Sequence, residues 1–562
     1  HIPPVNVVYV KSIPSFQSVS VDVFRDKILK IIFDAMEQRG IKEQIECIVY
    51  SSDIPVRIDA SGDLAPGQTT PPVFSPVASI NSLTFLYMPV LAKNLGFYVN
   101  LYSNFYATKI KSKGQENNSW TKEEMNKYAY CSNLLKEKEQ IVKNNDGKLN
   151  DEAKKKIKEA LNIIIELEKV HLNAYELLYN KACCLAQLSR KTETLETLRL
   201  AQQNGWIDWK HTERDTDLAI LKDDPEFSKI ILEMKNAKIE MTEPEAFSAK
   251  KYWNPDGTTG KNPESGIKYL LSTVLSCTSG RGMSVERTLE YLRDSASADF
   301  ANYEGTIYFE KNKDVRSTTR EWGFEIAADE IRKCGVKAVV EEGTLPQNRN
   351  DVAGLLVGSA GFEWKKSGSS ILKGAICEHL TSCGGMLGEN DGQTSLSEFL
   401  EYGASGASGT VCEPYAIQAK FPTPFIQLYY VKGFTLAEAF YLSVSAPFQL
   451  LIVGDALCKP WAKKNDIKIS ELPENGIING KLSFTPIPIS KQNFRLTEHH
   501  LYIDGKFSEK ISENKPFEID QNKISDGVHN VTIVSVSDSP QKFIGRKEFT
   551  LKSGNTKIYP II

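Results

Sequence analysis

Several signatures that would settle a function are missing from this sequence. It holds no HExxH zinc-protease motif, no pair of CxxC motifs, no GxxxxGK[ST] phosphate loop and no GxSxG nucleophile elbow. No stretch reaches the roughly 18 consecutive apolar residues of a membrane-spanning helix, so we expect no transmembrane segment. A net charge of -3 lacks the basic excess of nucleic-acid binders, so we expect no nucleic-acid partner.

Metal-ligand patterns and disulfide patterns are sparse as well. Ten cysteines in 562 residues are too few for a disulfide scaffold. Cys377, His379 and Cys383 could be combined as soft metal ligands, but zinc sites show tighter paired spacing and a fourth ligand. We therefore expect neither a metal site nor a cofactor.

The chain is too long for one hydrophobic core, and its character changes twice. The pattern predicts a discontinuous α/β domain at 1–110 and 251–468, a helical insert at 111–250 and a β-sandwich at 469–562. The insert is rich in Lys, Glu, Leu and Ala at helical spacing. The last segment alternates apolar and polar residues between DG turns, which is typical of a small Ig-like sandwich.

The stretch 351–414 organises the α/β domain. Apolar runs at 355–357 and 375–377 each end in a loop of small residues, and a helix and a third strand follow. Such strands, alternating with helices, are typical of a mostly parallel sheet with helices on both faces. Because ligands bind beyond the carboxyl ends of such strands, we expect 358–361, 382–385 and 413–414 to share one rim.

This layout resembles the caspase- and gingipain-like cysteine peptidases. In that fold, a strand ending in GHG supplies a His, and the next strand, ending in (A/S)CxxG, supplies the nucleophilic Cys. Here the sequence reads GSAG, with Ser359 where the resemblance places the His. Cys383, with Ser382 beside it, falls near the nucleophile position. His379 lies four residues before Cys383, but successive residues of a strand point to opposite faces.

A second resemblance covers most of the chain, through several long motifs that fall in one order. These motifs are similar to a family of large exported bacterial proteins, typical of planctomycete-like genomes with exosortase-type sorting systems. The resemblance implies export and an α/β core, and it brings no activity with it. The chain begins at His1 without a basic-apolar leader, which fits either a removed signal peptide or a trimmed chain. With the first alternative, we expect a periplasmic or cell-envelope location. The motifs are SVSVDVFRDKIL, YSSDIP, TSGRGMSVERTLEYL, GTIYFEKNKDVRSTTR, AGFEWKKSGSSILKGAICEHLTS, GASGASGTVCEPYAIQAKFPTPF and QLLIVGDALCKPWA.

Polar residues after the predicted strands are further candidates for the rim. Arginine side chains suit carboxylate or phosphate groups, so an anion pocket is one interpretation. The alternative is that these arginines pair with Asp314 and with loop carbonyls, and that Asp53 only caps a turn. The candidate ligand-binding residues are Asp53, Arg281, Arg316, Arg320, Ser359, Ser382 and Glu413.

Within the insert, 175–205 resembles a tetratricopeptide helical hairpin. Ala182, Leu185, Leu198 and Ala201 fall at its packing positions, while Thr194 stands where Ala is usual. Helix pairs of this kind stack on neighbours. The insert is therefore either a groove for a protein partner or a helical element that packs on the core.

Two functions remain open. The first is a non-catalytic, exported envelope protein that binds a protein or ligand through its α/β rim, its insert and its β-sandwich. The second is a cysteine-type hydrolase in which Cys383, or Ser382 beside it, is the nucleophile and the base comes from elsewhere in the chain, with His379 as the candidate. Without a base, a thiol near its free pKa is a weak nucleophile, so Ser359 in place of the His favours the first function. Oligomeric state is left open.

Overall fold

The computed structural model describes residues 2–66, 69–70, 73–111, 122–171, 174–237, 240–248, 252–260, 266–388, 392–469, 471–473, 476–478, 480–489 and 494–554. The fold is mixed α/β, and the chain divides into two compact units. The first unit comprises His1–Asp63, Pro76–Ala107 and Pro244–Ile562, and the second comprises Leu64–Ser75 and Thr108–Glu243. The domain boundary expected between 250 and 251 lies outside the described residues.

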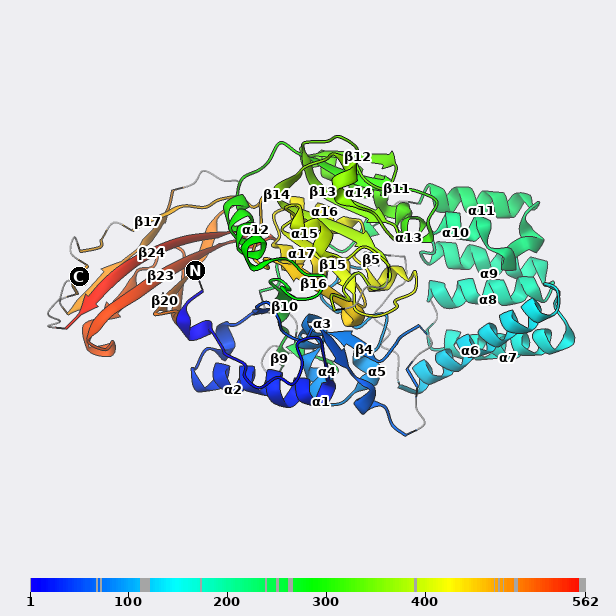
Figure 1. Ribbon diagram of the computed structural model, residues 1–562, viewed down its shortest axis with the longest axis horizontal. Helices are drawn as coiled ribbons and strands as arrows, with labels where there is room; N and C mark the ends of the chain where they lie inside the picture. Colours follow the sequence, from blue (N-terminus) through cyan, green and yellow to red (C-terminus); the bar gives the residue numbers. More distant parts are fainter. Residues whose placement is uncertain are drawn as a thin grey trace. The chain divides into compact units, whose positions relative to one another are not determined.

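An eight-stranded sheet forms the centre of the first unit (Figure 1). Neighbouring strands are parallel except β15 and β16, whose antiparallel pairing reverses the direction of the sheet. The strands β12, β11, β13, β14 and β15 therefore run one way, and β16, β10 and β2 run the other way. The order across the sheet is β12 (Lys337–Glu342), β11 (Thr306–Lys311), β13 (Val352–Gly358), β14 (Ile371–Leu380), β15 (Gly406–Thr410), β16 (Leu450–Gly454), β10 (Leu271–Val274) and β2 (Cys47–Tyr50).

The middle strands are buried on both faces, as the apolar runs in β13 and β14 predict. Every residue of β13 and of β15 is buried. In β15, Gly406 and Gly409 point to opposite faces. A Cβ on Gly406 would meet Leu436 of α17 (Leu436–Ser443) at 2.4 Å, and a Cβ on Gly409 would meet the backbone at Gly384, which precedes α15 (Ser397–Glu401), at 2.5 Å. Other segments of the polypeptide therefore cover both faces of the sheet.

The helices of the first unit lie between these strands in the sequence or before them. Several begin at a side-chain cap: the Thr435 hydroxyl accepts from the N–H of Glu438 while the Glu438 carboxylate accepts in return, which forms a capping box at α17. The helices are α1 (Val21–Phe24), a π-turn (Arg25–Leu29), α2 (Lys30–Gln38), α3 (Ile80–Phe85), α4 (Tyr87–Leu91), α5 (Leu95–Tyr98), α12 (Val285–Ala298), α13 (Val315–Thr318), α14 (Phe324–Lys333), α15 (Ser397–Glu401), α16 (Phe425–Val431) and α17 (Leu436–Ser443).

Two small sheets flank the large one within the first unit. In one of them β1 pairs in parallel with β3, which pairs in antiparallel fashion with β4; in the other β7 pairs with β8 and β9. Trp253 of β7 stacks on Tyr269 with ring centroids 3.9 Å apart, and this buries both rings beside the first residues of β10. The strands are β1 (Ser18–Ser20), β3 (Arg57–Asp59), β4 (Val77–Ser79), β7 (Tyr252–Trp253), β8 (Thr259–Gly260) and β9 (Ile267–Lys268).

The C-terminal segment is a β-rich module that packs within the first unit. Its antiparallel strands form one four-stranded and two two-stranded sheets. Strand β23 alternates buried and exposed residues, as a strand with one solvated face requires. Phe543 of this module lies against Gly433, where a Cβ would approach its ring to 2.6 Å. The strands are β17 (Ile467–Ile469), β18 (Lys481–Phe484), β19 (Pro486–Pro488), β20 (Leu496–Ile503), β21 (Lys506–Ser512), β22 (Phe517–Asp520), β23 (Gly527–Ser537) and β24 (Ile544–Ser553).

The second unit is mainly helical. Helices α8 and α9 form a hairpin in which Ala182, Leu198 and Ala201 are fully buried, and Thr194 is buried as well. One hydrophobic cluster lies between α8, α9 and α11, and another lies between α6, α7 and α8. Its elements are β5 (Ile110–Lys111), α6 (Lys122–Asn144), α7 (Asp151–Glu168), α8 (Tyr175–Gln187), α9 (Lys191–Gln203), α10 (Trp209–Arg214), a 3-10 helix (Thr216–Leu221), α11 (Pro225–Lys235) and β6 (Glu240–Met241).

Candidate functional site

The ends of β13 and β14 bring the two sequence-predicted motifs together. Val357 pairs with His379 and Gly358 pairs with Leu380 in the parallel register. Ser359 therefore follows β13 at the same edge of the sheet at which Thr381, Ser382 and Cys383 follow β14. We call this edge the rim. Glu413 follows β15, which is parallel to β14, and so leaves the sheet in the same direction.

Gly358 holds the loop after β11 against the rim. A Cβ at Gly358 would lie 2.1 Å from the amide nitrogen of Ser317 and 2.2 Å from the carbonyl carbon of Arg316, so only glycine permits this approach. The amide group of Asn312 donates to the carbonyl oxygen of Gly358 at 3.0 Å. Arg316 is thereby placed beside Ser359.

Cys383 occupies a turn directly after β14. Its side chain is partly exposed, and its φ of 60° puts the backbone in the left-handed region, which is uncommon for a residue other than glycine. Its backbone N–H donates to the Thr410 hydroxyl at 3.3 Å, which ties the turn to the end of β15. The neighbouring Ser382 is also partly exposed.

His379 is enclosed on the other side of this turn. It is fully buried, and its ring makes edge-to-face contacts with Phe362 and Phe399 at centroid distances of 5.2 and 5.5 Å. Nε2 lies 3.1 Å from the Thr394 carbonyl oxygen. Because a carbonyl only accepts hydrogen bonds, Nε2 carries the hydrogen. Burial lowers the pKa of His379 to about 3, so the imidazole is neutral at physiological pH.

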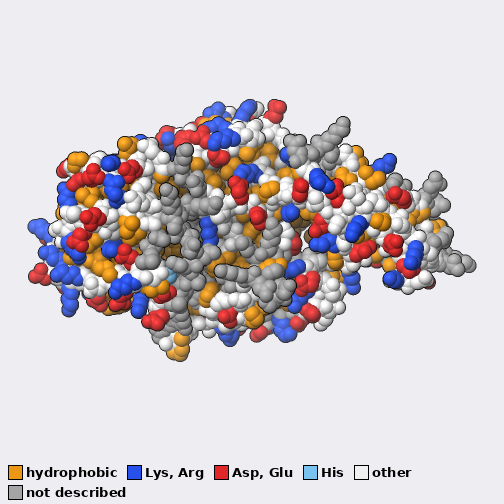
Figure 2. All heavy atoms as spheres, turned by 180° about the vertical axis from the view of Figure 1, so that it is seen from behind, with side chains coloured by type: hydrophobic (Ala, Val, Ile, Leu, Met, Phe, Trp, Pro, Cys, Tyr) orange, Lys and Arg blue, Asp and Glu red, His pale blue; other side chains and the backbone are white. Residues whose placement is uncertain are grey.

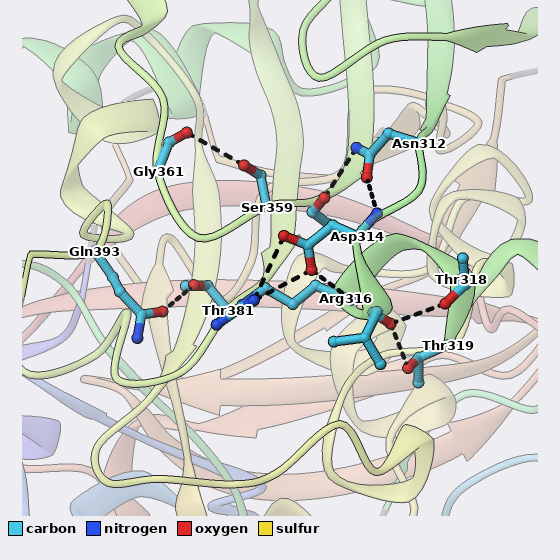
Figure 3. A network of polar contacts seen from close by, with 11 residues as sticks. Asn312, Asp314, Arg316, Thr318, Thr319, Ser359, Gly361, Thr381 and Gln393 are labelled. Carbon is cyan, nitrogen blue, oxygen red and sulfur yellow. Dashed lines mark hydrogen bonds and ion pairs between the residues drawn. The ribbon is translucent and has the colours of Figure 1, made fainter.

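Ser359 supplies no substitute base. Its hydroxyl donates to the carbonyl oxygen of Gly361 at 3.2 Å and remains within its own loop (Figure 3). A hydroxyl cannot hold a proton taken from a thiol at neutral pH, whereas an imidazole can.

The loop after β11 presents an ion pair at the rim. Arg316 Nη1 lies 3.1 Å from a carboxylate oxygen of Asp314, and Figure 3 shows this pair close to Ser359 and Thr381. Both side chains are partly exposed. The Thr381 hydroxyl donates to the side-chain oxygen of Gln393 in the loop that follows Cys383. The rim is thus polar, and its charges are locally balanced.

Arg320 lies away from solvent, below the rim. Its side chain and that of Glu378 are both fully buried and form an ion pair. Arg320 Nη2 also donates to the carbonyl oxygen of Val357 at 2.7 Å, and Glu378 accepts from the Ser408 hydroxyl at 3.0 Å. Arg320 is therefore a core residue and not a rim ligand, which corrects the prediction that it contacts a ligand.

The remaining candidates follow strands of the opposite direction or form local turns. Asp53 follows β2 and accepts from the Thr278 N–H at 3.2 Å; because β2 runs opposite to β14, the rule that placed Asp53 on the rim does not apply. Arg281 follows β10, which also runs opposite to β14, and its guanidinium donates to the carbonyl oxygen of Gln393. Glu413 is exposed and accepts from the Tyr415 N–H at 2.7 Å.

One pair near the rim escaped the sequence analysis. Glu310 of β11 and Glu341 of β12 lie opposite each other in register, and Glu310 is only 1% exposed. Burial and the neighbouring carboxylate raise the pKa of Glu310 to about 8. A glutamate that follows the apolar run IYF, one residue before the end of β11, was the available signal.

Over the described ranges, no group of three or more His, Cys, Asp and Glu side chains is arranged to hold a metal ion. Within the same ranges, no helix is both long enough and apolar enough to cross a membrane.

Comparison with known proteins assigns no family to this chain. No family model matches it, and no curated protein matches it. Fibronectin(III)-like modules of CbhA from Clostridium thermocellum are 13% identical, over 19% of this chain and 52% of that chain, with a TM-score of 0.13. The spore cortex lytic enzyme SleM of Clostridium perfringens is 9% identical, over 45% of this chain and 91% of that chain, with a TM-score of 0.15. The chain thus spans about half the length of the first of these structures, and at such TM-scores neither likeness carries an argument.

Proposed function

We propose that this chain is a non-catalytic binding protein that contacts a protein or ligand partner through its rim and its helical unit. The observation that carries this proposal is the environment of His379. A Cβ built on Gly384 would lie 3.5 Å from Cε1 and 3.6 Å from Nε2 of the His379 ring, so this edge of the ring faces the turn. Nε2 donates to the Thr394 carbonyl oxygen. The nitrogen nearest the turn of Cys383 is therefore a hydrogen-bond donor, not a base.

A catalytic thiol needs a group that takes its proton. In the layout that the sequence resembles, the His after the first strand does this work, and here Ser359 stands at that point. A histidine with a pKa of about 3 would have little tendency to accept a proton from a thiol at neutral pH. Neither Ser359 nor His379 is suited to act as the base, which favours a binding function over hydrolysis.

The rim offers a partner hydrogen bonds and paired charges. Arg316 and Asp314 place a cation and a carboxylate side by side and partly exposed, and the turns after β13 and β14 add the hydroxyls of Ser359 and Ser382. A neutral or zwitterionic polar segment, such as an extended peptide, can meet both charges at once.

The finer fold assignments are part of the same proposal. The parallel neighbours β13 and β14, with Ser359 and Cys383 at one edge, support a degenerate caspase-like core. The antiparallel strands after 467 support an Ig-like module, and the hairpin of α8 and α9 supports a tetratricopeptide-like unit. The sequence resemblance supports export to the cell envelope.

The helical unit is the second candidate contact surface. It is amphipathic, because its helices bury two hydrophobic clusters and expose charged residues. On the face drawn in Figure 2, basic and acidic side chains are interspersed over the molecule. A mixed surface of this kind suits a polar protein partner better than a lipid surface or a nucleic acid.

Thiol reactivity tests the proposal directly. The intact chain is treated with a thiol-directed electrophile at neutral pH, and the labelling rate of each cysteine is read by mass spectrometry. Cys277, which is partly exposed like Cys383, serves as the internal reference. We expect Cys383 to react no faster than Cys277. Fast and selective labelling of Cys383, with an amidase activity lost in Cys383→Ala, would establish a hydrolase instead.

Binding requires its own experiment. A partner captured by the wild-type chain from the native cell envelope should be retained by Cys383→Ala, since the thiol has no role in binding. Arg316→Ala should reduce capture, and Lys313→Ala, an exposed change in the same loop, should leave it intact. Equal capture by all three variants would exclude the rim as the contact surface.

A further inference from the structure

Strand β12 forms one outer edge of the large sheet, where Figure 1 shows it beside β11. Its direct neighbour in the sheet is β11 on one side, and no second strand pairs with it among the described residues. An edge strand presents unpaired backbone groups, which make it a template for another strand.

The direction of the free backbone groups follows from two hydrogen bonds. The Gly343 N–H donates to Lys311 of β11, whereas the carbonyl oxygen of Ala338 accepts from Arg332, on the outer side. Backbone groups of successive residues alternate in direction along a strand. Ala338, Val340 and Glu342 therefore point outward, and Lys337, Val339 and Glu341 bond toward β11.

The side chains of Lys337, Val339 and Glu341 share one face of the strand. Lys337 is exposed, Val339 is 36% exposed and the Glu341 side chain is 27% exposed. The face thus has a lysine at one end, a β-branched apolar residue in the middle and a glutamate at the other end. When a second copy runs in the opposite direction, each lysine lies opposite a glutamate.

We propose that two copies of this chain pair through β12 in antiparallel fashion, with Val339 facing Val339 of the second copy. A two-fold axis at this point makes the contact isologous and self-closing. It places Lys337 opposite Glu341 of the second copy, and Glu341 opposite Lys337 of the second copy. Ala338 and Val340 then form the hydrogen-bonded pairs with Val340 and Ala338 of the second copy.

Neighbouring registers fit the side chains less well. If the second copy slides along β12, only a shift of two residues keeps the outward backbone groups of the two strands facing each other. One such shift sets Val339 against Glu341 of the second copy, and the next sets Glu341 against itself, which is repulsive. The shift in the other direction sets Lys337 against Val339 of the second copy. Charge complementarity therefore selects the register centred on Val339.

The acidic pair in the sheet gives the second copy a further role. Glu310 and Glu341 face each other across β11 and β12, and Arg349 Nη2 reaches Glu341 at 3.3 Å. Lys337 of the second copy would bring a second cation, beside Arg349, to Glu341. Arg332 must release the carbonyl oxygen of Ala338, so the pairing is expected to be weak and reversible.

Charge exchange provides a sharp test. Sedimentation equilibrium of the full chain over a concentration series should show a monomer–dimer equilibrium. Lys337→Glu and Glu341→Lys should each raise the dissociation constant by about tenfold or more, since each change affects both symmetry-related pairs. The double exchange, Lys337→Glu with Glu341→Lys, should restore the dissociation constant to within about threefold of the wild type.

Val340→Pro gives a test that does not depend on charge. Proline removes an outward N–H and is tolerated on edge strands, so this variant should stay folded by circular dichroism and lose the dimer. A wild-type chain that is monomeric at every concentration would overturn the proposal. A dimer that survives Val340→Pro, or whose affinity the double exchange fails to restore, would overturn it as well.

Discussion

Arg320 and Glu378 form an ion pair in which both side chains are completely buried. Arg320 comes from the segment between α13 and α14, and Glu378 comes from β14, so the pair joins the loop after β11 to the middle of the sheet. Further hydrogen bonds attach Arg320 to Val357 and Glu378 to Ser408. A charge in such a place is tolerated only when it is paired, because desolvation of a lone ion costs several kcal/mol.

Removing one partner of this pair should destabilise the first unit strongly. Arg320→Met leaves the Glu378 carboxylate buried without its cation, and we expect a loss of about 3–5 kcal/mol in unfolding free energy. Chemical denaturation, followed by tryptophan fluorescence, measures the change.

The double variant Arg320→Met with Glu378→Leu is the matched control. Replacing both ions by apolar groups of similar volume removes the desolvation cost together with the pair. We expect the double variant to be more stable than Arg320→Met alone. Additive losses from the two substitutions would show that the residues are not coupled.

The buried imidazole of His379 should make stability depend on pH. Its pKa is about 3 in the folded chain, against an ordinary value of 6.5. The unfolded chain binds a proton below pH 6.5 that the folded chain refuses, so this contribution is fully present above pH 6.5 and is lost as pH falls toward 3. Its size is roughly 4–5 kcal/mol across the whole window. Thermal unfolding at a series of pH values between 7 and 4 would reveal it.

His379→Gln should remove that pH dependence, because the glutamine amide can donate to Thr394 without titrating. The control is Phe362→Leu, which loosens the packing against the same ring and leaves the imidazole in place. It should lower stability at every pH and keep the slope of the wild type. An unchanged slope in His379→Gln would refute the assignment.

The carboxyl pair on β11 and β12 has the opposite pH dependence. Glu310 has a pKa of about 8 when folded and 4.5 ordinarily, so it stays protonated where the unfolded chain has already released its proton. Stability contributed by the protonated carboxyl is therefore complete below pH 4.5 and falls as pH rises toward 8. Glu310→Gln should stabilise the chain by roughly 2–3 kcal/mol at pH 7 and have little effect at pH 4.

Glu342→Gln is the control for this prediction. Glu342 adjoins Glu341 in the sequence, but its side chain is 76% exposed and pairs with Lys311. Its loss should change stability by no more than about 0.5 kcal/mol at either pH. If Glu310→Gln gives equal shifts at pH 4 and pH 7, the Glu310 proton is not the cause.

The local elements of the core were predictable because each depends on a short stretch. The apolar runs of β13 and β14 and the small residues after them predict where Ser359 and Cys383 leave the sheet. The alternation of side chains along a strand also predicts that Glu378 and His379 point to opposite faces of the sheet.

The pairing of strands that are distant in sequence was not predictable. The reversal between β15 and β16 depends on the long connection 411–449 and on no local pattern. That reversal is why Asp53 and Arg281 follow strands of the other direction. The burial of Arg320 depends in the same way on Glu378, which lies 58 residues away along the chain. A charge pattern alone cannot distinguish a rim arginine from a core arginine.

Gly358 allows the loop after β11 to pack directly against the end of β13, and a larger residue at this position should push the loop away. A Cβ there would overlap the backbone of Arg316 and Ser317, which cannot rotate away as a side chain could. We expect Gly358→Ala to cost about 2–3 kcal/mol through overpacking and to displace the loop that carries Arg316. Gly361 lies three residues later, and the nearest atom to a Cβ there is the Thr394 hydroxyl at 3.9 Å. Gly361→Ala should therefore stay within about 0.5 kcal/mol of the wild type, and comparable losses from the two variants, measured by thermal unfolding, would contradict a specific role for Gly358.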